Sequence, residues 1–369
     1  MKVLTKYLSI VLFAVFLGGL MIAHLVLPDR EFSPLENRSL AQKPDFSVEG
    51  LLDGSYTSDL EKYFADQFPL RDEFMSLKAT CERLWGRKEN NGVYLGDDRL
   101  LEKVEEVDQE QLSTTLGALN RLKMSTDVPI WLMPVPTAAW LHADELPLGA
   151  PTADQDELMG QLRGGSLNGV IDLRTVFEAH KDEGLYYRTD HHWTSRGAYY
   201  GAAAFLERLG REVPVLGEPT VLAEDFNGTL FSSSGYRHIT PDVMESYIAG
   251  EGVTVETWRN GSPETIGLID ESFLAEKDKY SAYLGGNTPL SIVRTGMEDG
   301  GRLLIVRDSY ADSFVPFLTE SYSEIHLFDA RYYKQPLSQY IAQNAIDEVL
   351  VLYSMPDLCT DVNLPVVCK

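Results

Sequence analysis

Cysteine is scarce in this sequence, with three in 369 residues. So few thiols do not make a disulfide scaffold, and none stands in a turn beside a histidine motif, which argues against a cysteine nucleophile. Cys81 should be unpaired, whereas Cys359 and Cys368 could close a small loop near the carboxyl end if the protein works in an oxidising exterior. The H-x-x-x-H and C-x-x-C spacings typical of zinc sites are also missing.

Positive charge is in short supply as well. The chain has 32 Lys and Arg against 56 Asp and Glu, which gives a formal net charge of −24. Because a phosphate polymer would be repelled, nucleic acid is excluded as a partner, and an anionic polysaccharide would need a local basic patch. Repeats and low-complexity tracts are absent too, and a hydrophobic content of 44% predicts a folded chain with one large α/β domain and additions, or two lobes.

The first residues contain the one long apolar run. Tyr7 to Leu27 is of membrane-spanning length, follows Lys2 and Lys6, and precedes Pro28. A cleaved signal peptide is the alternative, but a small-x-small cleavage site is missing. We therefore expect residues 1–28 to be a cytoplasmic stub and signal-anchor helix, which makes the chain a single-pass cell-membrane protein with its carboxyl-terminal part outside the cytoplasm.

Behind the anchor we expect two further parts. Residues 29–90 are predicted to form a juxtamembrane helical segment, interrupted near Phe68-Pro69. Residues 91–369 are predicted to form the catalytic domain, with a β-rich insertion at about 211–299 that borders the active site. The insertion is indicated by Asn260-Gly261, a strong hairpin signal between two runs of strand-forming residues.

The run Asp190-His191-His192-Trp193 contains the first candidate catalytic residues. Extended spacing places the side chains of Asp190 and His192 on one side of the chain and that of His191 on the other. An imidazole oriented by a carboxylate is what a serine nucleophile requires. Two alternatives stay open: the three polar residues could be a loop cluster or helix cap, or they could bind a metal ion.

A second candidate lies more than a hundred residues later. Gly301 to Arg307 is an apolar run typical of a buried parallel strand, Asp308-Ser309 comes where it stops, and Tyr310 to Leu318 has helical periodicity. A serine in such a turn is exposed at the carboxyl edge of the sheet, and the helix behind it favours a developing oxyanion. Alternatively, Ser309 and Asp308 only cap the helix.

The other predicted elements give the alternation of a parallel sheet. Strands are predicted at residues 129–136, 169–173, 324–328 and 348–352, and helices at 195–209 and 336–345. This βαβ order predicts an α/β domain.

Several short motifs together resemble one known family. They are Glu36-Asn37-Arg38, Asp66-Gln67-Phe68-Pro69-Leu70-Arg71-Asp72, Val93-Tyr94-Leu95-Gly96, the D-H-H-W run, Tyr283-Leu284-Gly285-Gly286-Asn287, Arg307-Asp308-Ser309-Tyr310 and Phe328-Asp329-Ala330-Arg331-Tyr332-Tyr333. The sequence resembles the DHHW protein family, within the SGNH-hydrolase-like group that includes the alginate O-acetylation proteins. The resemblance implies a three-layer α/β fold with a mainly parallel sheet, and it implies Ser309 as nucleophile, His192 as base and Asp190 as its orienting partner.

The sequence departs from the family pattern in two places. Arg307 stands where the glycine of a G-D-S turn is expected, and its side chain could clash with the turn or point outward and attract an anionic substrate. The asparagine that donates to the oxyanion in SGNH hydrolases is missing from its strand end, where Tyr353 stands instead. Tyr353 could donate together with the backbone N–H of Ser309, or it could simply pack. Asn227, Asn287 and Arg331 join Arg307 as candidate substrate-binding residues.

The residues predict a membrane-anchored extracytoplasmic enzyme that forms a serine acyl-enzyme without cofactor or metal, and the family resemblance implies that it is an O-acetyltransferase acting on a cell-surface or exopolysaccharide. In related systems a polytopic membrane O-acyltransferase supplies the acyl group, so such a partner is implied by analogy. One alternative is a carbohydrate esterase or deacetylase with the same residues. Another is a non-catalytic glycan-binding or envelope-assembly protein, for which Arg307 is the best support.

Overall fold

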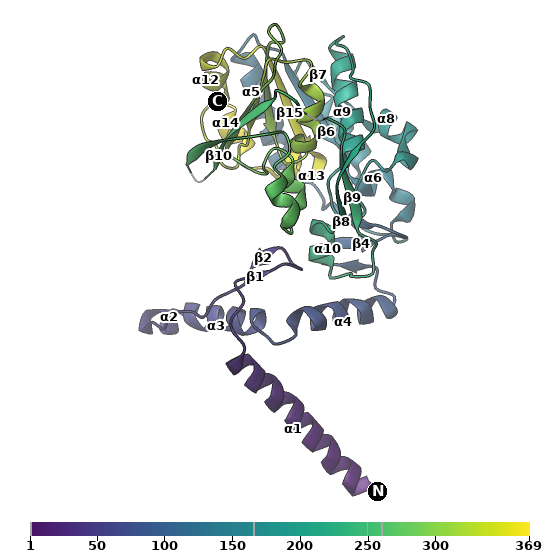
Figure 1. Ribbon diagram of the computed structural model, residues 1–369, viewed down its shortest axis with the longest axis vertical. Helices are drawn as coiled ribbons and strands as arrows, with labels where there is room; N and C mark the ends of the chain where they lie inside the picture. The colour runs from purple at the N-terminus through teal and green to yellow at the C-terminus, as the bar shows by residue number, and fades with distance from the viewer. Residues whose placement is uncertain (1, 165–166, 249, 260) are drawn as a thin grey trace. The chain divides into compact units, whose positions relative to one another are not determined.

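The computed structural model describes residues 2–164, 167–248, 250–259 and 261–369. The chain divides into two compact units (Figure 1). One contains residues 1–87 and 232–237, and the other contains residues 88–231 and 238–369.

The first unit is mostly helical. Its elements are α1 (Lys2–Val26), β1 (Phe32–Ser33), β2 (Arg38–Ser39), α2 (Val48–Asp53), α3 (Ser55–Asp66) and α4 (Arg71–Leu84). Within α1, residues Tyr7–Val26 have a mean hydropathy of 2.4 and are long and apolar enough to cross a membrane. The helical segment is broken between α3 and α4, as Pro69 predicts, and Leu70 takes a left-handed conformation with φ 58° at the break.

An ion-pair network ties the β1–β2 hairpin to this break. Arg38 binds both oxygens of Asp66, at 2.6 and 2.8 Å, and the carboxylate of Glu36 accepts from Arg38 and Arg71 at 2.7 and 2.6 Å. The hydrogen bond from Arg38 lowers the pKa of Asp66 to about 2. Two of the motifs that suggested a family, at residues 36–38 and 66–72, are therefore bound to each other.

The second unit is built on an eight-stranded sheet of order β11-β10-β12-β14-β13-β15-β6-β7. Its strands are β6 (Ile130–Val135), β7 (Gly169–Val170), β10 (Thr254–Arg259), β11 (Ser262–Ile266), β12 (Leu290–Arg294), β13 (Arg302–Arg307), β14 (Glu324–Phe328) and β15 (Glu348–Ser354). The five strands from β14 to β7 are parallel, whereas β12, β10 and β11 are added antiparallel. The sheet is thus mixed, and the expectation of a mainly parallel sheet holds only for this five-stranded part.

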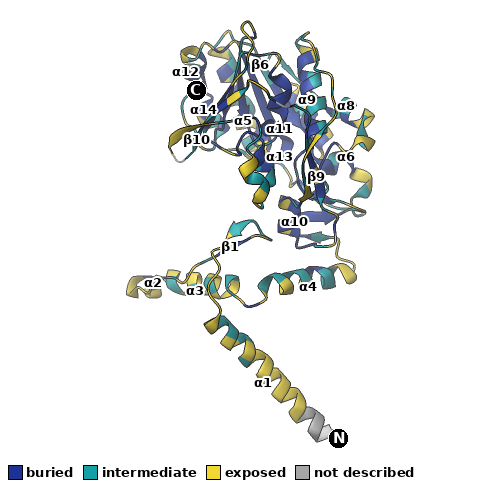
Figure 2. Ribbon diagram, in the orientation of Figure 1, coloured by how far each residue is buried: buried dark blue, intermediate teal, exposed yellow. Residues whose placement is uncertain are grey.

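Helices cover both faces of the sheet. Side chains alternate along a strand, so in β13 Leu303 and Ile305 join one hydrophobic core and Leu304 and Val306 join the other. The first core contains α6 (Ala138–Leu141), α8 (Arg174–Ala179), α9 (Ser195–Arg208) and α11 (Ala311–Phe314). The second contains α5 (Gln109–Met124), α7 (Gln155–Leu162), α12 (Leu337–Gln343), α13 (Met355–Thr360) and α14 (Leu364–Val367). The central strands β14, β13, β15 and β6 are almost wholly buried (Figure 2), whereas the edge strand β11 is exposed.

The region predicted as a β-rich insertion, residues 211–299, is divided between two sheets. Strands β8 (Thr220–Phe226) and β9 (Asp242–Ser246) form a separate antiparallel pair, whereas β10, β11 and β12 extend the central sheet because β12 pairs with β14. The predicted hairpin is present, with Arg259 opposite Ser262. Asn260 of its turn lies outside the described residues. A small third sheet consists of β3 (Glu89–Asn90), β4 (Val93–Leu95) and β5 (Leu100–Glu102).

The three cysteines are all free thiols. Cys359 and Cys368 are buried in the second core, where burial raises the pKa of both, and they do not form the loop-closing disulfide that the sequence allowed. Both side chains pack as small apolar groups.

Candidate active site

Ser309 lies in the turn between β13 and α11, as the sequence predicts. The preceding Asp308 is 1% exposed and stabilises this turn: one carboxylate oxygen accepts from the backbone N–H of Tyr310 at 2.9 Å and the other from that of Ser354 at 2.6 Å. Burial, followed by the charge of Asp357, raises the pKa of Asp308 to about 8. The nucleophile candidate is therefore held at the carboxyl edge of the parallel strands by a carboxylate that bridges β13 and β15.

The helix after this turn is shorter than predicted. α11 covers only Ala311–Phe314, and a 3₁₀ turn, Val315–Leu318, continues it. Pro316 has no backbone N–H to continue the α-helical pattern. A four-residue helix adds little dipole, so helix-terminal stabilisation of an oxyanion is smaller here than the sequence suggested.

Ser309, His192 and Asp190 form one hydrogen-bonded chain. The Nε2 atom of His192 lies 2.7 Å from the hydroxyl oxygen of Ser309, and its Nδ1 atom lies 2.5 Å from Oδ1 of Asp190. His192 and Asp190 are 5% and 1% exposed. Although burial alone would raise it, the pKa of Asp190 is held well below its ordinary value by the neighbouring imidazoles and by hydrogen bonds from His192. The structure thus brings together three residues that the sequence separates by up to 119 positions.

The carboxylate of Asp190 is fixed on both sides. Oδ1 also accepts from the backbone N–H of His192 at 2.9 Å, and Oδ2 accepts from the backbone N–H and the hydroxyl of Thr229 at 2.7 and 3.1 Å. Gly228 lies against this carboxylate so closely that a Cβ there would be 2.1 Å from Oδ2. The segment Phe226 to Thr229, which the sequence presents as an ordinary turn, therefore positions the candidate triad.

Replacing Gly228 by alanine should displace Asp190. We expect a loss of about 1–3 kcal/mol in the free energy of unfolding from the added methyl group. A shift of the carboxylate by about 1 Å should also lower kcat about 10²-fold. Urea unfolding followed by tryptophan fluorescence, together with ester turnover, measures both effects. Gly217→Ala is the matched control, because Gly217 is exposed and a Cβ there meets nothing within 4 Å. Equal losses in the two variants would contradict this role of Gly228.

Asp242 supports the segment that leads into the motif. Its carboxylate accepts from the backbone N–H groups of Arg188 and Thr189 and from the hydroxyl of Thr189, at 2.6 to 3.1 Å. Sequence reasoning missed this residue, because it lies more than fifty positions away at the start of β9 and stands in no recognisable motif.

Aromatic rings enclose the imidazole of His192. The ring of Tyr280 stacks on it with centroids 3.8 Å apart and planes 8° apart, and the Tyr280 hydroxyl donates to the carbonyl of Ser309 at 3.2 Å. Trp193 is fully buried and donates to the carbonyl of Tyr310 at 3.0 Å, which anchors the motif as its size predicts. Tyr280 was not identified from the sequence, because it lies in a 3₁₀ turn, Lys279–Ala282, that belongs to neither half of the site. It limits the orientations open to His192 and can stabilise an imidazolium.

Arg307 does not contact solvent. Its side chain is 1% exposed and pairs at 2.9 Å with Asp312, which is equally buried. Its guanidinium also donates a hydrogen bond to Oδ1 of Asn287 at 3.3 Å. The prediction that Arg307 binds substrate is therefore wrong, because the guanidinium is turned into the protein, where burial requires a charged partner. It also leaves the bond between Ser309 and His192 intact, which removes the main support for a non-catalytic protein.

The other candidate substrate-binding residues lie in different surroundings. Asn287 is exposed, and its Oδ1 accepts from Arg307 and, at 3.1 Å, from Arg331. Arg331 is 34% exposed and bound to Asp329 at 2.7 Å. Asn227 is half-buried and donates to the carbonyl of Asp225 in its own loop. Binding of substrate by these three residues stays a prediction.

Tyr353, the candidate oxyanion donor, lies in the second core at the end of β15 and is 1% exposed. Among the described contacts, none joins its hydroxyl to Ser309. The backbone N–H of Ser309 likewise has no acceptor among the described residues. The main-chain donor is therefore available, and the part assigned to Tyr353 stays a prediction.

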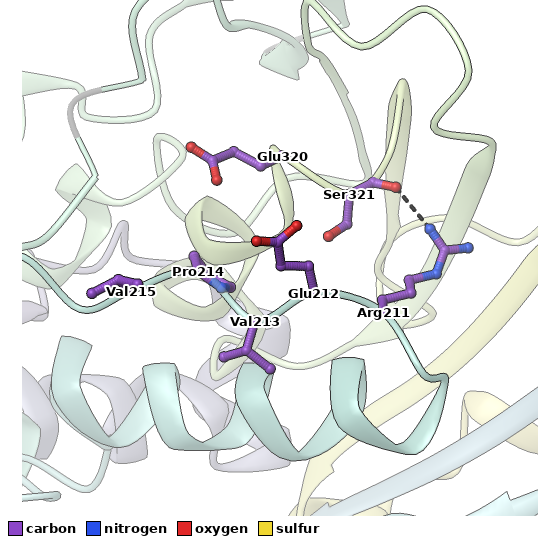
Figure 3. Close-up of a pocket in the computed structure, with 7 residues that line it drawn as sticks. All are labelled: Arg211, Glu212, Val213, Pro214, Val215, Glu320 and Ser321. Carbon is purple, nitrogen blue, oxygen red and sulfur yellow. Dashed lines mark hydrogen bonds between the residues drawn. The ribbon is translucent and has the colours of Figure 1, made fainter.

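A hollow of about 400 Å³ elsewhere in the second unit does not contribute to this site. It is lined by Arg211, Glu212, Val213, Pro214, Val215, Glu320 and Ser321 (Figure 3). Arg211 donates to the carbonyl of Ser321 at 2.7 Å and stacks over the ring of Tyr322. The lining contains no member of the triad.

The alternative of a metal site has a geometric basis. Ligand atoms of Asp190, His191 and His192 lie within 4.8 Å of one another. Both ring nitrogens of His192 are, however, hydrogen-bonded, to Asp190 and to Ser309, and Nδ1 of His191 lies 2.6 Å from the hydroxyl of Thr229. A metal ion bound by His192 would have to displace one of its two partners.

The family model described as DHHW protein matches residues 36–111 and 167–328. The chain belongs to the DHHW protein family. A second model, described as the SGNH hydrolase-like domain of acetyltransferase AlgX, matches residues 93–226. A crystal structure of a DHHW family protein from Eubacterium siraeum is similar, with 26% identity, a TM-score of 0.64, and coverage of 75% of this chain and 95% of that one. PatB1 of Bacillus cereus shares the fold, with 22% identity, a TM-score of 0.61, and coverage of 76% and 99%.

Two relatives share sequence similarity over part of the chain. A probable alginate O-acetylase AlgJ of Pseudomonas syringae pv. tomato is 26% identical over 233 residues, which is 58% of this chain and 56% of the relative. A probable alginate O-acetylase AlgJ of Pseudomonas putida is 26% identical over 192 residues, or 48% and 50%. The chain thus spans about half the length of these relatives. The expected family and the SGNH hydrolase-like fold are confirmed.

Proposed function

We propose that this protein is an extracytoplasmic O-acetyltransferase that transfers an acetyl group to a hydroxyl of a cell-surface glycan or exopolysaccharide. The observation that carries the proposal is the hydrogen-bonded chain of Ser309, His192 and Asp190. Similarity to probable alginate O-acetylases over about half their length supports the reaction class. Fold alone would not, because one fold serves many activities.

In the first half-reaction the Ser309 hydroxyl attacks the carbonyl carbon of an acetyl donor, and its proton passes to Nε2 of His192. Asp190 stabilises the resulting imidazolium through Nδ1. The backbone N–H of Ser309 donates to the tetrahedral oxyanion. When the intermediate collapses, the donor's C–O bond breaks, the leaving alkoxide takes the proton from His192, and the acetyl group stays on Ser309.

In the second half-reaction a sugar hydroxyl takes the place of the leaving group. His192 accepts its proton as the sugar oxygen attacks the acetyl carbon, and returns a proton to Ser309 when the ester bond to the serine breaks. Water in place of the sugar gives acetate, so the same residues would serve a carbohydrate esterase. Product analysis separates the two outcomes.

The apolar helix α1 supports the proposed location. α1 would anchor the chain, with Lys2 and Lys6 on the cytoplasmic side and the second unit outside. Acetyl groups made in the cytoplasm must then cross the membrane to reach the site. A polytopic membrane O-acyltransferase is the kind of partner that would deliver them.

The activation of Ser309 can be tested with a sulfonyl fluoride. We expect phenylmethylsulfonyl fluoride to form a sulfonyl ester on Ser309 of the detergent-solubilised full chain, because an activated serine oxygen displaces fluoride from sulfur. Peptide mapping by mass spectrometry locates the modification. His192→Ala should abolish it, whereas the matched variant His191→Ala should keep it. An unmodified Ser309, or equal modification in both histidine variants, would rule out the proposed triad.

A further inference from the structure

A second hollow, of about 200 Å³, lies at the carboxyl edge of the parallel strands. It is lined by Asp308, Arg331, Tyr353, Asp357, Thr360, Asp361, Val362 and Asn363. Asp308 follows β13, Arg331 follows β14, and Tyr353 stands near the end of β15. Ligands of open α/β sheets bind at this edge.

The hollow and the candidate nucleophile share one turn. Asp308 forms part of its wall and directly precedes Ser309, and its two carboxylate oxygens hold the backbone of Tyr310 and Ser354. A molecule in the hollow is therefore next to the turn on which the acetyl group would be carried.

Two polar atoms in the wall are poorly paired. Among the described residues, the hydroxyl of Tyr353 and Oδ2 of Asp361 are buried and complete no hydrogen bond of normal geometry, although the phenol and the carboxylate of Asp361 lie within reach of each other. Tyr353 as a whole is 1% exposed. Burial and the carboxylates of Asp361 and Asp308 raise the pKa of Tyr353 well above its ordinary value, so the phenol is a donor. Burying a polar group without a well-formed hydrogen bond is unfavourable. A ligand hydroxyl, which both accepts and donates, would satisfy the phenol and the carboxylate together.

The charge in the hollow is mostly negative. Asp357 and Asp361 line it against the single guanidinium of Arg331, which is already bound to Asp329 and Asn287. Asp308 adds little negative charge, because its pKa of about 8 keeps it largely protonated at neutral pH. Lys334 is exposed, is not among the lining residues, and donates to Oδ1 of Asn363 at 2.6 Å. The formal net charge of the whole chain is −24. A uronic-acid polymer such as alginate would bring one carboxylate per sugar to this wall, and like charges a few ångströms apart repel each other.

We infer that this hollow is the acceptor subsite, and that it takes a sugar rich in hydroxyls and free of carboxylates rather than a uronate. The inference rests on the proposed function, since it names the acceptor class of the same site. The lining contains no member of the triad, and the link to the nucleophile is Asp308, which directly precedes Ser309. Carboxylates that accept from sugar hydroxyls would hold a sugar ring beside this turn.

Acceptor preference tests this directly. The full chain in detergent is given p-nitrophenyl acetate as donor and either cellopentaose or pentamannuronate as acceptor, in EDTA so that calcium cannot bridge two carboxylates. Mass spectrometry counts acetylated oligosaccharide. We expect at least a tenfold preference for cellopentaose. The double variant Asp357→Asn/Asp361→Asn should narrow that preference at least threefold by slowing transfer to cellopentaose and speeding transfer to pentamannuronate.

The matched control is Asp299→Asn, an exposed carboxylate in the loop before β13. It removes one charge from the surface and should leave the preference unchanged. The inference is overturned if transfer to pentamannuronate is as fast as transfer to cellopentaose or faster. It is also overturned if Asp299→Asn changes the acceptor preference as much as the double variant does. Release of nitrophenol without transfer to cellopentaose also overturns it, while leaving the serine chemistry in place.

Failure of the proposed function has a different signature, which is nitrophenol release no faster than in Ser309→Ala. In that case the affinity of the hollow for the two oligosaccharides tests the inference about the acceptor sugar without any turnover. In calorimetric titrations of Ser309→Ala, cellopentaose should bind at least tenfold more tightly than pentamannuronate, and Tyr353→Phe should weaken that binding. Undetectable or unselective binding contradicts the subsite.

Discussion

Replacing Asp190 by asparagine is expected to lower kcat for an activated acetyl ester about 10⁴-fold. Each oxygen of Asp190 accepts two hydrogen bonds, from His192 on one side and from Thr229 on the other. An asparagine has one oxygen only. If its NH₂ faces His192, Nδ1 must accept and Nε2 carries the proton, so the imidazole can no longer take the proton of Ser309. If its NH₂ faces Thr229, two donors oppose each other, which costs about 1–3 kcal/mol of stability.

Asp242→Asn is the control for this prediction. It is the same chemical change in a carboxylate that accepts from the backbone N–H groups of Arg188 and Thr189, but it leaves Asp190 and His192 themselves unaltered. We expect a loss of kcat below about 10²-fold, from imprecise positioning alone. Turnover of p-nitrophenyl acetate by the full chain measures both variants. A comparable loss of kcat in the two variants would mean that Asp190 only keeps the segment around His192 ordered and does not orient the imidazole directly.

The parts of the site that the sequence predicted are those with a local signature. The apolar run before Asp308-Ser309 predicted β13 and its turn, since a buried parallel strand is continuously hydrophobic. The spacing of Asp190 and His192 predicted that both could face one way, and the structure places their side chains in contact. That Ser309 meets His192 needed the family resemblance, because residues 117 positions apart share no pattern.

The parts that were missed depend on tertiary contacts. Tyr280 stacks on His192 from a 3₁₀ turn whose sequence gives no sign of it, and Gly228 matters because of one close approach to Asp190. The mixed character of the sheet was missed for a related reason. Alternation of strands and helices predicts parallel pairing for neighbouring βαβ units, but it does not say that β12 will add antiparallel to the edge of β14.

Arg307 is the clearest case, because the direction of its side chain depends on a tertiary contact with Asp312. Replacing Arg307 by methionine should reduce the free energy of unfolding by about 3–5 kcal/mol well above pH 7, where the buried carboxyl of Asp312 would have to carry its charge without a cation. Urea unfolding of the full chain, followed by tryptophan fluorescence, measures the loss. Adding Asp312→Asn in the same chain should recover most of it, since a neutral amide tolerates burial better than an unpaired charge. Arg294→Met is the matched control: Arg294 pairs with Glu256 on the exposed side of β12, and a surface pair contributes at most about 1 kcal/mol.

The loss should also depend on pH. Burial raises the pKa of Asp312 to about 7, against the lowering effect of Arg307. A carboxyl whose pKa is higher in the folded than in the unfolded state binds more protons when folded, so its contribution to stability falls as pH rises from about 4 toward the folded value. Without Arg307 the pKa of Asp312 in the folded state is higher still. The free energy of unfolding then continues to decrease as the pH rises above 7. The difference in the free energy of unfolding between Arg307→Met and the natural chain should therefore increase above pH 7. The double variant, which has no carboxyl at position 312, should not show this dependence on pH. A pH-independent difference would mean that Arg307 stabilises the turn by packing alone.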